Sequence, residues 1–564
     1  MPGGLLNIIA YGNHNVFLNN NPSKSFFKCV YAKYTNFGIQ KFRIDYSGLR
    51  ELKLNQSSEF TFKIPRYAEL LLDNYLVLQL PDIWSPIYPP QSTTDEWKPY
   101  EFKWIENIGT MAIQEVIISV GGQKIQQYTG EYIYNLKERD FSSKIELFDK
   151  MTGNIKELND PANAFNRNNE YPNAYYNETT EGPEPSIRGK KLYIPLSSFF
   201  SFSSKMAFPL VSLQYNELNI NIKIRPLKEL FTIKDITNST NDKFERIQPN
   251  FNINEHAFYR FLNPPPSVEL YDTDYEDQTN RFNADVHLIS SYCFLTEDES
   301  KVFAKNEQKY LIKEIKQTTF HNIVNSSKIE IESNGMISSW MWFLRRTDAN
   351  LRNEWSNYSN YAYKNIMPYP IYNESSENLT TLQENLKEDL ENNELNMDKI
   401  YEYGPFVNPS DGEITNIKLS GDFKEENLKD ILQKFSIIFD GKYRENEFDG
   451  SLYNTVEKYR SCNGDSDDGL YIYNFCLFTS PFDNQPSGAI NLNKFKKIEF
   501  ELTTITPPVN DEANFTNICD DSGELIGVTK NTWDIYTYTY DLILFEERYN
   551  ILHMINGNAG LMYS

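Results

Sequence analysis

Short runs in which every second residue is apolar recur from one end of the chain to the other. The clearest is residues 218–225 (LNINIKIR), which alternates until Pro226. Similar runs occupy residues 60–64, 329–332, 498–502 and 535–540. A period of two predicts strands with one covered face, as antiparallel sheets require. The runs are short and bounded by Gly, Pro, Asn and Asp, which predicts an all-β sandwich or barrel.

Helices are predicted to be few. Residues 296–315 form one candidate, in which Thr296 and Glu299 have the spacing of a capping box. Its predicted buried stripe consists of Val302, Phe303, Tyr310, Leu311 and Ile315. A second candidate, residues 382–403, is polar nearly all round, which is typical of a solvated surface helix or a mobile insertion.

The two halves of the chain resemble each other. Residues 116–120 run into Gly121-Gly122 and residues 435–439 run into Asp440-Gly441, which are both hairpin signals. Each half then continues through an LYI segment (192–194 and 470–472) to an alternating run. This pattern favours a duplicated β-sandwich. Residues 231–282 contain Asn and Asp clusters and three consecutive prolines, and are the predicted linker region.

Composition fits this interpretation and excludes several functions. The 564 residues suffice for two large sandwiches, and the 15% aromatic content favours strands. The formal net charge of −23 disfavours direct binding to nucleic acid or to an anionic membrane surface, since both depend on Lys and Arg. No run of about 18 apolar residues and no basic signal sequence is present. These features predict a soluble protein made in a reducing compartment.

No reactive centre is identifiable, so we predict no catalytic, cofactor-binding or metal-binding residues. The five histidines and five cysteines lack zinc-site spacing, and the cysteines are predicted to be core or surface thiols. Neither a G-x-x-x-x-G-K-[ST] loop nor a G-x-S-x-G motif occurs. The turn at residues 465–469 (DSDDG) fails the EF-hand pattern because Cys476 stands where a bidentate Glu is needed. A solvated acidic turn is the preferred interpretation.

Several segments, in the same order along the chain, resemble the major capsid proteins of nucleocytoplasmic large DNA viruses. They are residues 3–12 (GGLLNIIAYG), 26–31 (FFKCVY), 34–37 (YTNF), 104–109 (WIENIG), 120–125 (VGGQKI), 192–196 (LYIPL), 209–215 (PLVSLQY), 439–441 (FDG), 485–488 (QPSG) and 549–564. Residues 345–346 (RR) and 355–358 (WSNY) resemble the branch that infects algae and protists, near the mimivirus-like groups. Compared with shorter members, the chain has added residues around 145–190 and 365–430, which are expected to be long loops.

The resemblance implies two consecutive eight-stranded jelly rolls, in a homotrimer that forms a pseudo-hexagonal capsomer of an icosahedral shell. It implies an N-terminal arm at residues 1–27, jelly rolls at 28–231 and 283–550, a linker region at 232–282 and a C-terminal tail at 551–564. Expected partners are the chain itself, neighbouring capsomers, and minor capsid, cement and penton proteins. The expected location is the virion, after synthesis and assembly in the host cytoplasm. The base would face an inner membrane without the chain being integral to it.

Two alternatives remain at this point. A scaffold protein of the same fold would shape a membrane and be absent from mature particles. A two-sandwich protein that binds or cleaves carbohydrate would carry a cleft with a close carboxylate pair or an aromatic platform.

Overall fold

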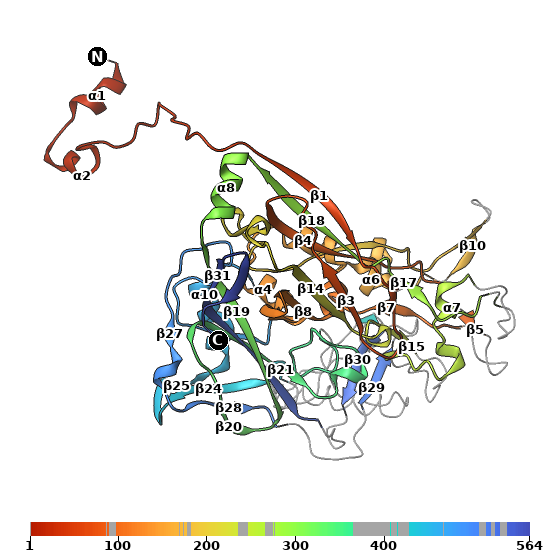
Figure 1. Cartoon of the computed structure of the whole chain (residues 1–564). Coiled ribbons are helices and arrows are strands. Elements are labelled where there is room, and N and C mark those ends of the chain that lie inside the picture. Colours follow the sequence, from red (N-terminus) through yellow and green to blue (C-terminus); the bar gives the residue numbers. More distant parts are fainter. Residues whose placement is uncertain are drawn as a thin grey trace, which may run out of the picture.

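The computed structural model describes residues 2–85, 87–88, 98–167, 170–172, 174–177, 182–234, 246–264, 275, 277–364, 406–407, 414–415, 428–465, 467–506, 515–519, 525–530 and 538–563. Within these residues the chain forms two β-sandwiches that lie against each other (Figure 1). We call the sheets of the first sandwich 1a and 1b, and those of the second 2a and 2b.

The first sandwich consists of two sheets of four main strands. Sheet 1a has the order β1 (Phe37–Asp45), β18 (His287–Leu295), β4 (Leu70–Gln79), β12 (Lys191–Pro195), with the short β13 (Phe208–Pro209) also paired to β4. Sheet 1b has the order β3 (Ser58–Lys63), β14 (Leu218–Ile224), β8 (Ile113–Val120), β9 (Gln123–Tyr128). All of these strands pair antiparallel.

The second sandwich repeats this arrangement. Sheet 2a has the order β19 (Gln308–Ile323), β31 (Tyr540–Ile555), β21 (Met336–Arg346), β26 (Leu470–Asn474), with β27 (Ile490–Asn491) and β32 (Asn558–Leu561) at its margins. Sheet 2b has the order β20 (Ser326–Glu330), β28 (Ile498–Thr504), β24 (Leu432–Phe439), β25 (Lys442–Asp449). In each sandwich the first strand along the chain lies beside the last. Two consecutive eight-stranded jelly rolls, the predicted fold, are therefore confirmed.

The equivalent hairpins use the same turn chemistry. The β8–β9 turn places Gly121 and Gly122 at φ of 56° and 86°, and the β24–β25 turn places Asp440 and Gly441 at 47° and 77°. Positive φ at both central residues is the geometry that matches the twist of two-residue hairpins, and Gly and Asp adopt it at low cost. Both predicted hairpins are present.

The strand pairing divides the chain differently from the predicted boundaries. β18 lies beyond residue 282, yet it pairs with β1 and β4 of the first sandwich. Residues 232–282 therefore connect β14 to β18 within that sandwich rather than linking the two jelly rolls. Residues 551–564 were expected to form a tail, but they continue β31 to Ile555 and return as β32. Both differences arise because long-range strand pairing is invisible in local composition.

The predicted helix at 296–315 is only partly correct. Helix α8 covers Glu297–Lys305 and β19 begins at Gln308. Tyr310 and Leu311 pair with β31, so they do not share a helical stripe with Val302, which is 55% exposed. The ladder with β31 outweighs the local helical spacing. The candidate helix at 382–403 lies outside the described residues, as do half of the predicted strand at 535–540 and most of the insertion at 365–430.

The remaining elements are short. The other helices are α1 (Gly3–Ile9), α2 (Val16–Asn19), α3 (Ile108–Ala112), α4 (Gly130–Asp140), α5 (Ile145–Thr152), α6 (Lys156–Asn159), α7 (Tyr259–Leu262), η9 (Leu452–Val456) and α10 (Glu457–Ser461). The 3₁₀ helices are η1 (Asn13–Asn15), η2 (Pro161–Asn166), η3 (Ser204–Met206), η4 (Leu210–Ser212), η5 (Leu227–Glu229), η6 (Asn254–His256), η7 (Ala349–Leu351) and η10 (Leu492–Lys494). Short strands are β2 (Glu51–Leu52), β5 (Ile87–Tyr88), β6 (Lys98–Pro99), β7 (Phe102–Trp104), β10 (Tyr175–Asn177), β11 (Gly182–Glu184), β15 (Phe231–Lys234), β16 (Arg246–Ile247), β17 (Phe282–Asn283), β22 (Phe406–Val407), β23 (Ile414–Thr415), β29 (Phe515–Cys519) and β30 (Leu525–Lys530).

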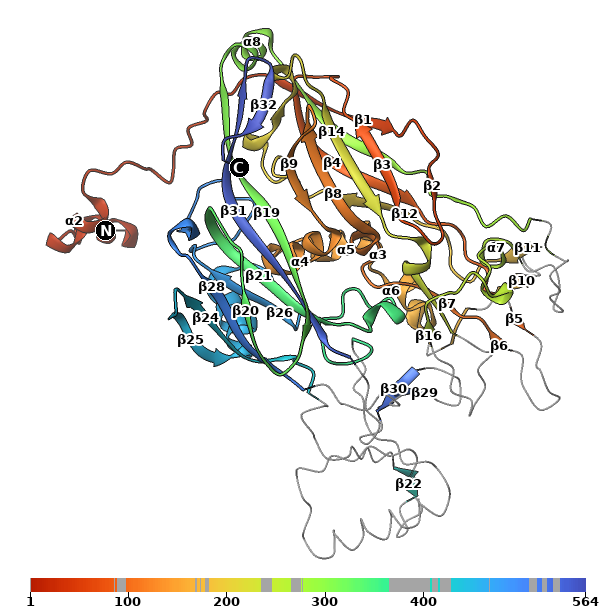
Figure 2. The ribbon, with the colours of Figure 1, turned by 60° about the horizontal axis from the view of Figure 1, so that its bottom comes forward.

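Sheet 2a is buried on both faces. Trp340 and Trp342 of β21 point into the core of the second sandwich, while the alternate residues Met341 and Phe343 join a cluster that includes the first sandwich. All four side chains are fully buried. A strand covered on both sides becomes a continuous apolar run instead of an alternating one. This arrangement joins the two sandwiches into one body (Figure 2).

The N-terminal residues do not pack on that body. Residues 2–36, which carry α1 and α2, are almost entirely exposed and extend away from the sandwiches (Figure 1). The strand order begins only at Phe37. No helix among the described residues has the length and apolar character needed to cross a membrane.

Candidate assembly surfaces

Helix α4 is the element that connects the two sandwiches, and we call α4 together with the sheet 2a face it covers the intrachain joint. The helix follows β9 directly, with Thr129 as its N-cap accepting a hydrogen bond from the Tyr132 backbone N–H at 3.4 Å. Lys137 and Arg139 lie in its last turn, where cations interact favourably with the helix dipole. Nearly every residue of α4 is buried, although its sequence is polar. The helix must therefore find polar partners in the second sandwich.

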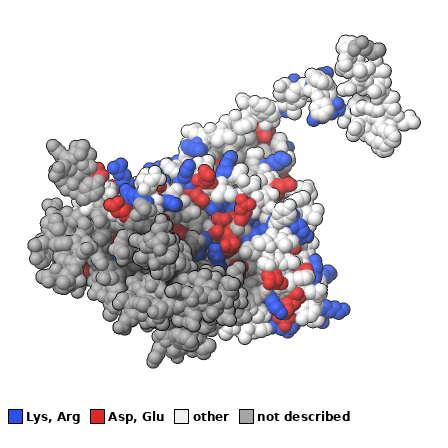
Figure 3. All heavy atoms as spheres, turned by 180° about the vertical axis from the view of Figure 1, so that it is seen from behind, with Lys and Arg blue, Asp and Glu red and all other residues white. Residues whose placement is uncertain are grey.

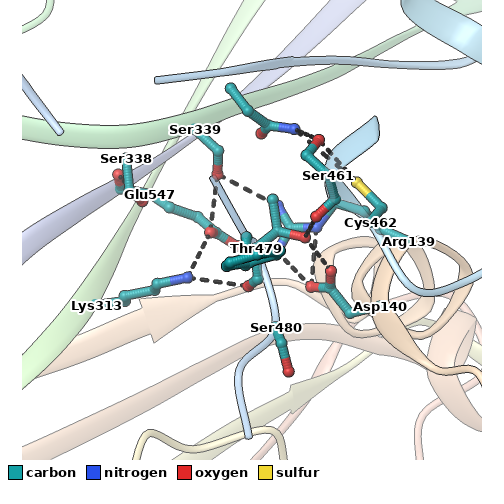
Figure 4. Close-up of polar contacts among 12 residues, drawn as sticks. Arg139, Asp140, Lys313, Ser338, Ser339, Ser461, Cys462, Thr479, Ser480 and Glu547 are labelled. Atoms are coloured by element: carbon teal, nitrogen blue, oxygen red, sulfur yellow. Dashed lines mark hydrogen bonds and ion pairs between the residues drawn. The ribbon is translucent and has the colours of Figure 1, made fainter. Parts of the chain in front are cut away.

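Arg139 is at the centre of those contacts and is completely buried (Figure 4). Its Nη2 lies 2.6 Å from Oδ2 of Asp140 and 2.6 Å from Oε1 of Glu547 on β31. The other carboxylate oxygen of Glu547 accepts from Ser339 Oγ at 2.9 Å and lies 3.3 Å from Lys313 Nζ. Two cations and two carboxylates thus balance in a buried cluster drawn from α4, β19 and β31.

The burial and pairing of these groups shift their pKa values in consistent directions. Desolvation opposes the ionisation of Glu547, but Arg139 and Lys313 overcome it and lower the pKa of Glu547 to about 2. The carboxylates beside Arg139 and Lys313 likewise overcome desolvation and raise the pKa of both cations. Glu547, Arg139 and Lys313 therefore stay ionised at neutral pH, and the joint depends on every partner being present.

A second ionic contact crosses the joint. Glu131 of α4 accepts from Arg345 of β21 at 2.5 Å and from Arg225 of the first sandwich at 3.2 Å. The Arg225 guanidinium also lies over the Trp355 ring, 4.1 Å from its centroid. These contacts lower the pKa of Glu131 despite its burial. The planar, charged guanidinium of Arg225 thus contacts both a carboxylate and an aromatic face, which suits its shape.

Residues 347–364 complete the joint from the side of the second sandwich. The Asn353 side chain donates to the backbone carbonyls of Lys228 and Phe231, both at 2.8 Å. The Tyr358 ring stacks on Phe343 with centroids 3.8 Å apart. A segment that follows the last residue of β21 is thereby fixed to the first sandwich. The two jelly rolls are thus joined by polar contacts from α4 and from residues 347–364.

The segment of residues 2–36, which comprises the N-terminal arm and its connection to β1, is rich in large exposed apolar side chains. Its large exposed side chains are Leu5, Leu6, Ile8, Ile9, Tyr11, Val16, Phe17, Leu18, Phe26, Phe27, Val30, Tyr31 and Tyr34. Its charged residues are Lys24, Lys28 and Lys33, with no acidic residue, in a chain whose net charge is −23. Clustered exposed apolar groups of this kind mark an interaction segment. The body differs, because acidic and basic side chains are interspersed over the described part of its surface (Figure 3).

The residues considered for chemistry are dispersed. His287, His321 and His553 each lie beside one carboxylate (Asp285, Asp541 and Glu307), and none joins another histidine or a cysteine. Cys293 and Cys476 are buried and Cys29 is exposed. Across the described residues, no group of three His, Cys, Asp or Glu side chains is placed to hold a metal ion.

The acidic turn at 465–469 is not simply solvated. Asp467 pairs with Lys364 and accepts a hydrogen bond from Tyr134 of α4. Asp468 lies 2.7 Å from Lys429. Both carboxylates are therefore paired with lysines, and Asp467 contributes to the contact between the sandwiches.

Two hollows border the joint. The first, of about 70 Å³, lies beside Tyr132, Lys313, Phe478 and Glu547. The second, of about 480 Å³, lies between β9 and β19 and has Lys124, Glu314 and Arg548 among its lining residues. Among the lining carboxylates, Glu547 pairs with Arg139 and Lys313, Glu314 lies 3.7 Å from Arg548, and Glu115 accepts a hydrogen bond from Gln127. This arrangement does not favour the carbohydrate-cleaving alternative.

The sequence did not reveal the residues of the joint. Arg139, Asp140, Lys313 and Glu547 are spread over most of the chain, and no motif links them. One signal was present: residues 541–550 (DLILFEERYN) carry two adjacent glutamates after an apolar run. A charge inside an apolar strand needs a buried partner.

Comparison with known proteins agrees with the fold. Residues 25–271 match the family described as major capsid protein N-terminus, and residues 299–560 match the large eukaryotic DNA virus major capsid protein family. β18 lies in the interval between these two matches.

Relatives match over the full length. The major capsid protein of Phaeocystis pouchetii virus is 24% identical, and that of Paramecium bursaria Chlorella virus 1 is 22% identical, each over 100% of both chains. Among solved structures, the Faustovirus major capsid protein has a TM-score of 0.59 at 11% identity, covering 94% of this chain and 93% of its own. The capsid of Paramecium bursaria Chlorella virus 1 has a TM-score of 0.57 at 18% identity, covering 96% and 100%.

The double jelly roll, the two consecutive family matches and the full-length relatives lead to one assignment. The chain belongs to the major capsid proteins of large eukaryotic DNA viruses and is a structural component of a virus capsid, not an enzyme.

Proposed function

We propose that three copies of this chain form a pseudo-hexagonal capsomer, and that many capsomers tile an icosahedral shell. The observation that supports this most directly is the intrachain joint. It holds two equivalent sandwiches together through a shared hydrophobic cluster, so a three-fold ring of chains presents six similar sandwiches. An outline close to six-fold packs a flat lattice without gaps.

The arm provides contacts beyond the capsomer. Residues 1–27 would lie at the base of the trimer and bind neighbouring capsomers or minor capsid, cement and penton proteins. Their exposed apolar side chains support this role, since an apolar segment with no partner in its own chain gains most by docking on another. Assembly would take place in the host cytoplasm, with the base of the shell facing an inner membrane.

The size of the particle in solution tests the trimer. Three chains of 66.0 kDa give about 198 kDa, which light scattering after size-exclusion chromatography measures directly. A monomer that persists at high concentration and forms no hexagonal arrays would refute the capsomer. Detection of the chain in purified mature particles separates a shell protein from a scaffold that departs.

Removal of residues 2–27 tests the arm. We expect the shortened chain to form trimers of normal stability, because those residues make no buried contact with the body. We expect hexagonal arrays to be lost or to need much higher protein concentration. Arrays that form as readily as those of the full chain would refute the proposed role of the arm.

A further inference from the structure

The duplication gives the helix of the joint a counterpart in the second sandwich. α4 follows β9, and the helical segment 450–461, which contains η9 and α10, follows the equivalent strand β25. Gly130 and Gly450 begin these two segments. A Cβ on Gly130 would lie 2.4 Å from the carbonyl oxygen of Ile113, and one on Gly450 would lie 2.4 Å from that of Leu432. Ile113 and Leu432 are the first residues of the equivalent strands β8 and β24, so the two glycines occupy the same position in the fold.

Counting from these glycines aligns the two helical segments. Arg139, nine residues after Gly130, corresponds to Tyr459, nine residues after Gly450. Arg139 is completely buried against sheet 2a, whereas Tyr459 is 94% exposed. Val456, one turn earlier on the same segment, is 55% exposed. The side of this segment that carries Val456 and Tyr459 is therefore exposed in the second sandwich, whereas Tyr453, Lys458 and Ser461 are buried within the chain.

The sheet face that such a helix would cover is also present and is partly exposed, with Tyr75 and Ile289 half-buried and Val77 fully buried. In sheet 1a, Tyr75, Val77, Tyr193 and Ile289 point away from the core, since the residues that alternate with them (Leu76, Leu78, Leu192, Ile194 and Leu288) fill it. Cross-strand pairing places Val77 beside Tyr193 and Tyr75 beside Ile289. Tyr193 is 38% exposed, and Ile39 on the adjoining edge strand β1 is 58% exposed.

The equivalent face of sheet 2a shows what this face becomes when it is covered. Its outward residues Met341, Phe343, Ile543 and Phe545 are each at most 2% exposed, because α4 and the first sandwich lie on them. The chain thus carries one completed joint and the two unmatched halves of another. The helical segment 450–461 belongs to the second sandwich and the outward face of sheet 1a belongs to the first. Within one chain the two sandwiches already meet through α4 and sheet 2a, so the two halves remain apart.

We infer that residues 450–461 of one chain pack on the outward face of sheet 1a of a second copy, in the way that α4 packs on sheet 2a within the chain. This inference rests on the proposed trimer and assigns its contact surface. Such a contact joins two different surfaces, and rotation must close it into a ring to avoid an open fibre. Three copies close it with three joints inside chains and three between them.

The residue types suit the two kinds of joint. The intrachain joint forms once, during folding, and can hold the ion pair of Arg139 and Glu547. The joint between chains must be exposed before assembly and buried afterwards. A tyrosine is desolvated at much lower cost than an arginine and retains a hydroxyl for a polar partner. Tyr459 in the position of Arg139 is therefore appropriate for a surface that associates from solution.

A matched pair of substitutions tests the contact. Tyr459→Glu places a charge on the proposed surface, and Tyr215→Glu places the same charge on a tyrosine that is 75% exposed near the β31–β32 turn. We expect Tyr459→Glu to raise the protein concentration needed for trimer formation at least tenfold, and Tyr215→Glu to leave that concentration unchanged. Near-ultraviolet circular dichroism of both proteins confirms that the sandwiches are folded.

Cross-linking tests the contact without weakening the trimer. In a background with Cys29 replaced by Ser, Tyr459→Cys and Tyr193→Cys are combined in one chain and treated with a short bis-maleimide. We expect covalent dimers and trimers from the double variant and monomers from each single variant.

The outcomes separate the inference from the capsomer itself. A wild-type protein that stays monomeric refutes the proposed function. A wild-type trimer that neither weakens with Tyr459→Glu nor cross-links through positions 459 and 193 overturns only the assigned surface.

Discussion

The ionic cluster at the intrachain joint allows a quantitative prediction for Glu547→Gln. Glutamine keeps the shape of the side chain but removes the charge that balances Arg139 and Lys313. Arg139 retains Asp140, so the buried site is left with one positive charge in excess. Removing one partner of a buried pair typically destabilises a protein by about 3–5 kcal/mol, because the remaining charge stays desolvated.

The pKa of Glu547 gives an independent magnitude. Lowering it from 4.5 to about 2 corresponds to about 3 kcal/mol of stability at neutral pH. Because the folded-state pKa is the lower one, this contribution is complete above the unfolded value and is lost as pH falls toward about 2. We therefore expect the difference between wild type and Glu547→Gln to be about 3 kcal/mol at pH 7 and about 2 kcal/mol at pH 3.5.

Urea unfolding followed by tryptophan fluorescence measures this difference. The buried Trp104 reports on the first sandwich, and Trp340 and Trp342 report on the second. Protein concentration must be held constant, since association adds to apparent stability. The matched control is Glu217→Gln, which removes the exposed pair with Lys63 and should cost about 0–1 kcal/mol. A loss for Glu547→Gln no larger than that of the control, or one that grows as pH falls, would refute the reasoning.

Three further outcomes are expected. Gly450→Ala should prevent stable folding, because its Cβ would lie 2.4 Å from the Leu432 carbonyl oxygen. In the control Gly38→Ala the added Cβ meets nothing within 4 Å, so the melting temperature should change little. Equal melting temperatures for the two variants would contradict this prediction. Trp342→Ala should cost about 3–5 kcal/mol in urea unfolding by emptying the second core, and a cost below about 1 kcal/mol would be inconsistent with its complete burial. Burial beside Glu106 raises the pKa of Glu354 to about 8, so the free energy of unfolding falls as pH rises from 4.5 through 8. Glu354→Gln should therefore raise the melting temperature at pH 9 and not at pH 4. A gain of equal size at both pH values would disprove this assignment.

The limits of the sequence are visible in the first helix candidate, residues 296–315, and in the repeated LYI segments. Residues 308–315 have a helical spacing, yet they form a strand because β31 supplies a long partner. In the first segment Leu192 and Ile194 face the core, whereas in the second Tyr471 faces the core and Leu470 and Ile472 face the joint. The same residue types therefore face opposite sides of their sheets in the two segments, since strand register is fixed by pairing and not by composition.

The sequence by itself determined the strand-rich class, the hairpin turns at Gly121 and Gly441, and the duplication, because alternation and turn chemistry act over a few residues. It also carried the family resemblance, which residue order alone conveys. Only the tertiary structure decided that β18 closes the first sandwich, that Arg139 meets Glu547, and that the counterpart of Arg139 is left exposed as Tyr459. These features join residues that are far apart along the chain, and such contacts exist only once both sandwiches have folded.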